Sequence, residues 1–240
     1  TVYGINNSYS VMNSNNCSIK EIYLSNEFVN EIINEALLSK YSKKIKKVPK
    51  DHFKEKFKGI RSQGIVVSFF YKIKRDVITT NNKTNNCYVL LDSVKDPQNL
   101  GQIIRTSECA GVSGIIIPER RSVSITDTVL QVSQGAFCNI DLIISKNIKY
   151  TINELKNKGY WIVGLENSIE SKKWYEINMS GKIGLVFGSE GAGLRQITKK
   201  YCDFLATIPM SGKINSLNIS ATVSAILFER NRQILDSENN

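Results

Sequence analysis

The pattern of apolar and polar residues from residue 87 onward predicts strands that alternate with helices. Short apolar runs predict strands at 87–91, 114–117, 142–144, 161–165, 184–187 and 205–208. Several of these runs are rich in Ile, Val and Leu without a break by charged residues, which is typical of a parallel sheet covered on both faces. Between them, apolar residues at helical spacing predict helices at 100–110, 123–132, 148–158, 194–201 and 217–235. The pattern therefore predicts an α/β domain over 87–240 with a mostly parallel sheet flanked by helices.

The first third of the chain has a different pattern and predicts a small separate α/β domain over 1–75. Strands are expected at 19–24, 45–48 and 63–70. One helix is expected over 28–37, where apolar residues form a single stripe behind a Ser25 or Asn26 cap, and another is expected to begin at Asp51. The segment 76–86 is rich in Asn and Thr, which predicts a linker between the two domains.

Charge is concentrated in the same first third. The chain has a formal net charge of +10, and residues 1–86 contribute 15 Lys and Arg against 7 Asp and Glu. A basic domain beside a nearly neutral one indicates a polyanionic partner held by the first and chemistry performed by the second. A lysine-rich surface that is merely solvated explains the charge equally well.

Cysteine and histidine usage limits the chemistry. The five cysteines are scattered without a C-x-x-C pair, which favours reduced thiols in an intracellular protein and argues against disulfides and a zinc site. His52 is the only histidine, which argues against a histidine-based triad or metal centre. No apolar stretch approaches membrane-spanning length, and no signal-peptide pattern is present. The sequence begins at Thr1, so we leave open a cytoplasmic protein or an organellar one that has lost a leader.

Three segments of the larger domain carry candidate chemistry. The first places Asn99 and Arg105 six residues apart on a helix that follows Asp96-Pro97. The second is a strand that runs into Gly188-Ser189-Glu190-Gly191-Ala192-Gly193, whose glycine spacing is not that of a dinucleotide or phosphate loop. The third runs from Ile208-Pro209-Met210 to Ser216-Leu217-Asn218-Ile219-Ser220 and opens the last helix. Taken alone, each segment also fits an ordinary capped helix or turn.

Together, the three segments resemble the SpoU-type, TrmH-like RNA ribose 2′-O-methyltransferases of the SPOUT superfamily. They match the family's N-L-G…R-T, G-x-E-G-x-G-L and I-P-M…S-L-N-x-S blocks in order and spacing. The resemblance covers 87–235 and extends more loosely to 2–70, where Gln63-Gly64 matches the end of a substrate-recognition domain. Ser62 stands where family members usually have His.

The resemblance implies a knotted (trefoil) catalytic domain that acts as a homodimer with the site at the subunit interface. S-adenosylmethionine would be held near Gly188, Ile208 and Leu217, and no metal would be needed. Residues 1–75 would bind RNA, with large-subunit ribosomal RNA as the favoured substrate, and 87–240 would transfer the methyl group. No membrane partner is implied.

The resemblance also assigns catalytic positions. Arg105 matches the arginine to which the family's activation of the ribose hydroxyl is assigned. Since the pKa of an arginine is too high for it to act as a base, stabilising a developing alkoxide and gripping phosphate are the physically safer roles. Asn99, Glu190, Ser216 and Asn218 match positions that orient this arginine and the RNA. Glu190 is a candidate partner for Arg105 when RNA is absent.

Three alternatives accompany this interpretation. A transfer-RNA methyltransferase shares all three motifs, and only the separate basic domain favours ribosomal RNA. A non-catalytic RNA-binding or ribosome-assembly protein on the same fold would tolerate loss of Asn99, Arg105 or Glu190, all of which are present. A nucleotide enzyme on a Rossmann-like sheet would require the dinucleotide glycine spacing, which is absent.

Overall fold

The computed structural model describes residues 1–76, 78, 84–168, 171–189, 191 and 193–238. The chain forms two compact units, and each is continuous in space but not in sequence. The first comprises Thr1–Lys72 and Ile125–Asn139, and the second comprises Ile73–Ser124 and Ile140–Asn240.

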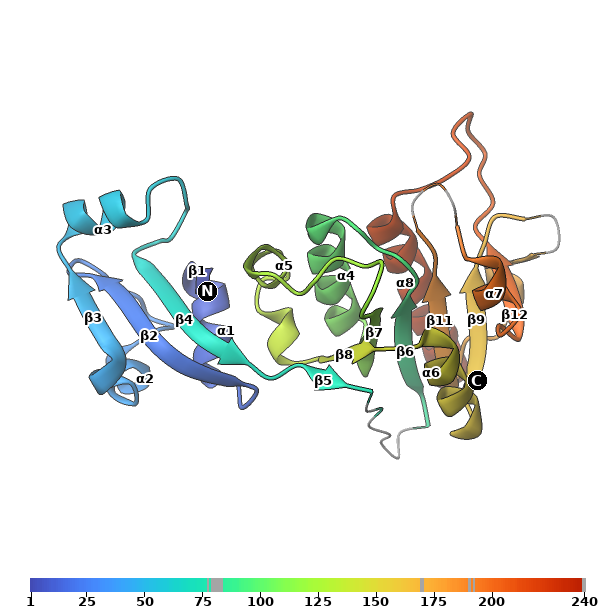
Figure 1. The fold of residues 1–240 in the computed structure, drawn as a ribbon, viewed down its shortest axis with the longest axis horizontal. Helices are drawn as coiled ribbons and strands as arrows, with labels where there is room; N and C mark the ends of the chain where they lie inside the picture. The colour runs from blue at the N-terminus through green and yellow to red at the C-terminus, as the bar shows by residue number, and fades with distance from the viewer. Residues whose placement is uncertain (77, 79–83, 169–170, 190, 192, 239–240) are drawn as a thin grey trace. The chain divides into compact units, whose positions relative to one another are not determined.

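The second unit is built on an eight-stranded sheet in which every neighbouring pair is parallel (Figure 1). The strand order is β10-β12-β9-β11-β6-β7-β8-β5. The strands are β5 (Lys74–Arg75), β6 (Asn86–Leu91), β7 (Gly114–Pro118), β8 (Asp141–Ser145), β9 (Trp161–Leu165), β10 (Lys172–Lys173), β11 (Lys182–Phe187) and β12 (Phe204–Thr207). The predicted parallel α/β sheet is confirmed, and the short edge strands β5 and β10 were not predicted because two residues give no periodic pattern.

Helices cover both faces of this sheet. They are α4 (Pro97–Cys109), α6 (Ile148–Asn157), α7 (Gln196–Lys199) and α8 (Ile219–Glu238), with a 3₁₀ turn η3 (Trp174–Glu176). Asp96 caps α4 by accepting a hydrogen bond from the Gln98 amide at 2.9 Å, and Pro97 fits the first helical position because it has no N–H to satisfy. In Figure 1, α6 lies in front of the strands, whereas α4 and α8 lie together behind them.

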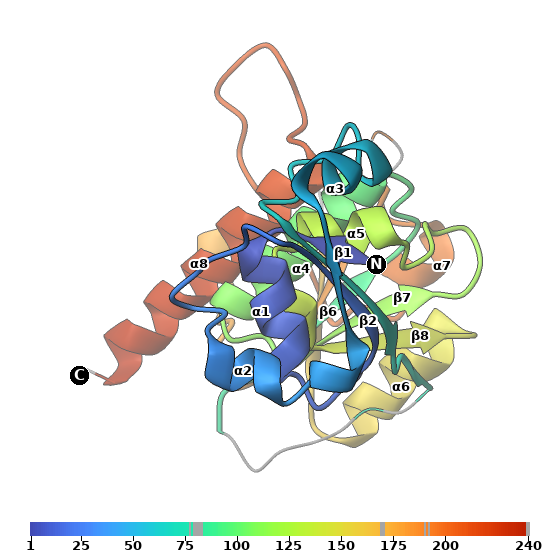
Figure 2. The ribbon, with the colours of Figure 1, turned by 90° about the vertical axis from the view of Figure 1, so that its left-hand side faces the viewer.

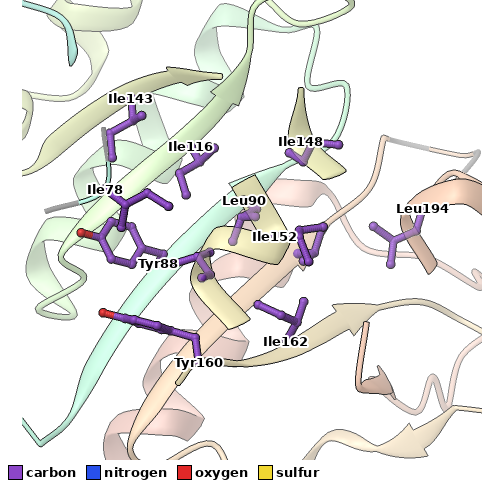
Figure 3. Close-up of a cluster of buried hydrophobic side chains, with 12 residues drawn as sticks. Ile78, Tyr88, Leu90, Ile116, Ile143, Ile148, Ile152, Tyr160, Ile162 and Leu194 are labelled. Carbon is purple, nitrogen blue, oxygen red and sulfur yellow. The ribbon is translucent and has the colours of Figure 1, made fainter. Parts of the chain in front are cut away.

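The core under α6 explains this arrangement. Ile148, Ile152 and Leu155 of α6 pack against Tyr88 and Leu90, which are alternate residues of β6 and therefore share one face (Figure 3). The rings of Tyr88 and Tyr160 meet edge to face with centroids 5.7 Å apart. The residues that alternate with Tyr88 and Leu90 along β6 point to the opposite face of the sheet. All six residues of the strand are buried, so the sheet is covered on both faces here. This is the burial that continuous apolar runs predict for a sheet covered on both sides.

The first unit contains a four-stranded sheet of order β1-β4-β2-β3, with α1 packed on its strands (Figure 2). Its elements are β1 (Val2–Tyr3), α1 (Ile5–Asn13), β2 (Cys17–Ser25), α2 (Glu35–Ser39), η1 (Ser42–Lys44), β3 (Ile45–Val48), α3 (Lys50–Lys56), β4 (Ile65–Tyr71), α5 (Asp127–Val132) and η2 (Ala136–Cys138). The helix α1 was not predicted, because its apolar residues are few among Asn and Ser.

The helix predicted over 28–37 is wrong. Only Glu35–Ser39 is helical there, and Val29, expected on the buried stripe, is 91% exposed. Asparagine side chains explain the difference. The Asn30 carboxamide oxygen accepts hydrogen bonds from the amides of Ile32 and Ile33, and Asn34 caps the shorter helix. These local bonds compete with helix formation and outweigh the apolar spacing.

The unit boundaries also differ from the predicted domain ranges. The segment 125–139, which contains α5, falls within the predicted 87–240 domain but belongs to the first unit. Gln131 links it to β1, because its side chain accepts from the Tyr3 amide at 2.9 Å and donates to the Tyr3 carbonyl at 3.0 Å. Conversely, β5 falls within the predicted 1–75 domain but pairs with β8 in the second unit. The expected linker 76–86 lies largely outside the described residues.

Candidate functional site

A cavity of about 320 Å³ opens at the carboxyl ends of β9, β11 and β12. Ligands commonly bind at this edge of a parallel sheet, where successive strand ends and their loops converge. The walls are apolar where the strands end and polar where the loops begin. The lining includes Leu165, Glu166 and Asn167 at the end of β9, Phe187, Gly188 and Ser189 at the end of β11, and Thr207, Ile208, Ser216, Leu217 and Thr222 from the end of β12 to the first turn of α8.

The three residues expected at the cofactor, Gly188, Ile208 and Leu217, all line this cavity, and so does Ser216. The loop from β12 to α8, which carries Ser216 and Leu217, rises at the top of Figure 1. These residues are separated by up to 29 positions in sequence, and the strand order β12-β9-β11 brings them together. The residues that the family resemblance grouped therefore lie together at one cavity, and their role there stays a prediction.

Gly188 has a structural role that the sequence did not reveal. A Cβ atom added to Gly188 would lie 2.1 Å from the carbonyl carbon of Gly193. The loop folds back on itself there, because the amides and carbonyls of Ser189 and Gly193 exchange two hydrogen bonds of 3.1 Å. Only glycine permits this close approach of two backbone segments.

Glu166 holds the same loop from the other side, and sequence reasoning missed it. Its carboxylate accepts a hydrogen bond from the Leu194 amide at 2.9 Å and pairs with Lys199 at 2.8 Å. The Glu166 side chain is only 12% exposed. A polar residue directly after the apolar run 161–165 was the available signal, since such positions lie at the ligand edge of a parallel sheet.

A second buried carboxylate fixes α7. The Asp92 side chain follows β6 and is fully buried. Its Oδ2 accepts hydrogen bonds from Arg195 Nε at 2.9 Å and from the Thr198 hydroxyl at 2.7 Å, and its Oδ1 forms an ion pair with Arg195 Nη2 at 2.6 Å. A paired and hydrogen-bonded carboxylate of this kind is costly to disrupt, because removing one partner leaves a buried charge without its counter-ion. Asp92 and Glu166 together anchor the segment 193–199 beside the cavity.

Asn167 joins two of the cavity loops. Its side-chain amide donates to the Asn215 carbonyl at 2.9 Å, and its carboxamide oxygen accepts from the Thr207 hydroxyl at 3.3 Å. The loop after β9 therefore contacts both ends of the segment between β12 and α8. This contact, too, was absent from the sequence-based prediction.

The predicted residues Asn99 and Asn218 meet at the contact between α4 and α8. The Asn218 amide donates to the Asn99 carboxamide oxygen at 3.0 Å, and Asn218 also accepts from the Ser220 amide at 2.8 Å, as a residue at a helix start does. Two further side-chain bonds continue along the same helix pair, from Ser220 to Gln102 at 2.8 Å and from Ser224 to Thr106 at 3.3 Å.

Arg105 is exposed on α4 and does not line the cavity. Six residues of an α-helix place it about 120° around the axis from Asn99. It therefore lies off the stripe of α4 that contacts α8. Glu190, its suggested partner, lies outside the described residues.

The described residues include no group of three or more His, Cys, Asp or Glu side chains that could hold a metal ion. Burial raises the pKa of Cys87 to about 11 and that of Cys202 to about 12, so both thiols are protonated at neutral pH. Within the described ranges, no helix has both the length and the apolar character that a membrane crossing needs.

Known proteins resemble this chain in sequence. A Staphylococcus saprophyticus protein named for the TrmH family of tRNA/rRNA methyltransferases is 45% identical over 141 residues, which is 59% of this chain and 56% of the relative. A Staphylococcus epidermidis protein of the same name is 42% identical over 154 residues, covering 63% and 61% of the two chains. The match therefore spans little more than half of each relative's length.

Solved structures share the fold. The SpoU methyltransferase AviRb from Streptomyces viridochromogenes, determined with AdoMet, superposes with a TM-score of 0.84 at 19% identity over 98% of this chain and 90% of its own. The A. aeolicus TrmH/SpoU tRNA modifying enzyme gives a TM-score of 0.59 at 28% identity over 64% and 78%. The SpoU rRNA Methylase family matches residues 86–228, well over half of the 240 residues, and the chain therefore belongs to that family.

Proposed function

We propose that this chain transfers the methyl group of S-adenosylmethionine to a ribose 2′-hydroxyl of RNA. The substrate that we propose is ribosomal RNA. The observation that carries the proposal is the cavity after β9, β11 and β12, which gathers Gly188, Ile208, Ser216 and Leu217 from the two last sequence motifs. The first motif is connected to this cavity by the bond between Asn218 and Asn99.

The lining suits a nucleoside-type methyl donor. Leu165, Phe187 and Ile208 offer apolar surface for an adenine ring, whereas Glu166 and Ser216 offer polar groups for hydroxyl and amino substituents. Binding pockets commonly combine apolar walls with a few such polar groups. S-adenosylmethionine supplies an activated methyl group on a sulfonium, so this chain's residues need to position the acceptor oxygen and ease the loss of its proton.

Arg105 is proposed to stabilise the negative charge that develops on the ribose oxygen and to bind an adjacent phosphate. A guanidinium suits both tasks because its planar fork of donors stays charged. Asn99 and Asn218 are proposed to hold α4, from which Arg105 projects, against the start of α8. Ser216 and Glu190 are proposed to contact the RNA or orient the arginine.

A homodimer accounts for the position of Arg105. Because this residue does not line its own chain's cavity, we propose that a second copy brings its Arg105 to that cavity. Phe228 and Leu235 of α8 are 51% and 58% exposed and lie seven residues apart, which puts them on one face of the helix. That apolar face supports the contact between copies, and the knot implied by the family resemblance is part of the same proposal.

The first unit is proposed to bind the RNA. Lys43 of η1 and Lys47 of β3 are exposed, and exposed lysines of this kind attract phosphate at low salt. The family name and the separate basic unit favour ribosomal RNA, whereas transfer RNA is the alternative substrate. The named relatives are bacterial, which supports activity in a bacterial cytoplasm and gives no support to an organelle.

The test combines binding and product analysis. Calorimetry should detect S-adenosylmethionine or S-adenosylhomocysteine binding in buffer with a metal chelator. Purified ribosomal RNA and transfer RNA should then be incubated separately with the protein and a methyl-labelled donor. Methylation of the 2′-oxygen blocks alkaline cleavage, so label should appear in alkali-resistant dinucleotides. Label only in mononucleotides would indicate base methylation, and label only in transfer RNA would select the alternative substrate.

A further inference from the structure

A second cavity lies at the opposite edge of the parallel sheet. Trp161, Lys182 and Phe204 are the first residues of β9, β11 and β12, whereas the cavity proposed for the methyl donor is lined by the last residues of these strands and the loops that follow them. These three residues line a hollow of about 430 Å³ together with Lys172 of β10 and the backbone near Gly159 and Gly181. Its size is in the range of small-molecule sites.

Two aromatic side chains of this hollow are open to solvent. Trp161 is 59% exposed and Phe204 is 36% exposed. Their ring centroids are 5.8 Å apart and the planes are tilted by 45°. A tryptophan is usually well buried in a globular protein, so one that remains open at the mouth of a hollow offers an unused apolar face to a ligand.

Three lysines lie on or beside the lining of this hollow, and one of them approaches the Phe204 ring. The Lys172 ammonium lies 5.8 Å from the centroid of Phe204, and Lys182 reaches toward Tyr160, whose centroid is 5.9 Å from its ammonium. Lys173 is adjacent to Lys172 and is 3.9 Å from Glu176, the acidic residue of the lining. With three lysines and one glutamate, this part of the surface carries an excess of positive charge.

We propose that this surface, formed by Trp161, Phe204, Lys172, Lys173 and Lys182, binds a single-stranded segment of the RNA substrate. A nucleobase stacks on the open face of Trp161, and Lys172 and Lys182 contact the flanking phosphates. Open aromatic faces interleaved with cations match this ligand, because every base has a stacking face and every nucleotide carries a charge. The proposal rests on the proposed function for the identity of RNA as the substrate.

The surface gives the second unit an RNA contact of its own. Trp161 belongs to β9, the strand whose other end leads to Glu166, so stacking and methyl transfer occur on one rigid sheet. Removing this RNA contact is therefore expected to raise the KM for RNA and to leave kcat and the affinity for S-adenosylmethionine unchanged.

Tryptophan fluorescence isolates this contact from RNA bound elsewhere on the full-length protein. A single-stranded dodecauridylate should quench the fluorescence of the wild-type protein, since a stacked base quenches an indole, whereas inorganic polyphosphate should not. The quenching should vanish in Trp161→Ala. It should persist in Tyr150→Ala, a matched control in which an aromatic residue of α6 with 67% exposure is removed.

Affinity provides the second measurement. Trp161→Ala should weaken dodecauridylate binding roughly fivefold to a hundredfold, the usual effect of removing one stacked base. Lys172→Glu should also weaken it and lower its salt dependence, while Tyr150→Ala binds like wild type. Equal quenching or equal affinity in Trp161→Ala and Tyr150→Ala would overturn the proposal. If quenching disappears in Trp161→Ala but the wild-type protein methylates no RNA, the RNA contact stands and the proposed function fails.

Discussion

The side chain of Asn218 joins the start of α8 to Asn99 of α4, with 3.0 Å between the amide nitrogen and the carboxamide oxygen. The same Asn218 accepts a hydrogen bond from the Ser220 amide, so one residue both caps a helix and positions its neighbour. The last motif of the sequence and the first are therefore connected through this side chain, beside the bond from Ser220 to Gln102. This contact makes Asn218 a sensitive position for both stability and activity.

Asn218→Ala should lower the free energy of unfolding by about 1–2 kcal/mol, because it removes the helix cap. Asn218→Asp should stay near wild type in stability, since it keeps an acceptor for Ser220 and Asn99 can turn its amide to donate. Urea denaturation followed by circular dichroism checks both values. Equal losses of stability in the two variants would show that capping is not the role of Asn218.

Glu166→Ala should weaken S-adenosylmethionine binding about tenfold, or about 1.4 kcal/mol, because the Leu194 amide loses its acceptor and Lys199 loses its partner. Glu166→Gln should weaken it less, since the amide oxygen still accepts from Leu194. Calorimetry gives the affinities. Glu154→Ala is the matched control, because it removes an ion pair of 2.8 Å to Lys158 and neither residue lines the cavity.

If Glu166→Ala binds the donor as tightly as Glu154→Ala does, the loop beside Gly188 does not depend on this carboxylate. Gly188→Val should abolish donor binding whatever the role of Glu166, because its side chain would collide with the backbone of Gly193. The expected cause is that the loop can no longer close against Gly193, and not that the valine side chain fills the space of the ligand.

The first unit's part in RNA binding can be tested in the full-length chain. Replacing Lys43 and Lys47 by Glu should weaken RNA binding and reduce the slope of log affinity against log salt by about 1.4–1.8, or about 0.7–0.9 for each phosphate that is no longer neutralised. Fluorescence anisotropy at several salt concentrations measures this slope. Lys149→Glu with Lys200→Glu, an equal charge change in the second unit, should alter the slope less. If the two double variants gave the same slope, the main RNA contact would not lie at Lys43 and Lys47.

The sequence predicted the parallel sheet because the runs around Val89, Ile115 and Val163 are apolar on both faces, and burial on both faces requires this composition. The family resemblance grouped Gly188, Ile208 and Leu217, and all three line one cavity, while their role in cofactor binding stays a prediction. Sequence reasoning missed Glu166, although a polar residue directly after the apolar run 161–165 was an available signal, and it missed Asn167, whose partners Asn215 and Thr207 are distant in sequence. The helix over 28–37 failed because hydrogen bonds from asparagine side chains outweighed apolar spacing.

The membership of 125–139 in the first unit could not be predicted either. The apolar spacing of α5 indicates a helix with a buried side, and this is correct, but periodicity does not identify the sheet on which that side packs. Long-range bonds such as those between Gln131 and Tyr3 decide it, and they join residues 128 positions apart.

Arg105→Ala should leave S-adenosylmethionine binding nearly unchanged and lower the rate of methylation by about a hundredfold or more, about 3 kcal/mol of transition-state stabilisation. Arg105→Lys should restore little, because one ammonium cannot replace the planar fork of donors. Single-turnover methylation with saturating donor and RNA separates this effect from binding. A wild-type rate in Arg105→Ala would overturn its assignment to the active site.

Mixing two inactive variants tests whether Arg105 acts across a dimer. The Arg105→Ala variant retains an intact cavity, and the Gly188→Val variant retains the Arg105 side chain. If the site combines one copy's cavity with the other's arginine, each mixed dimer contains one site in which both parts are intact. Statistical mixing of equal amounts makes half of the dimers mixed, each with one of two sites restored, so activity should return to about a quarter of the wild-type level. Each variant alone should stay inactive. If both proteins are dimeric by sedimentation and exchange subunits but show no recovery, Arg105 serves its own chain's cavity and the shared site is excluded.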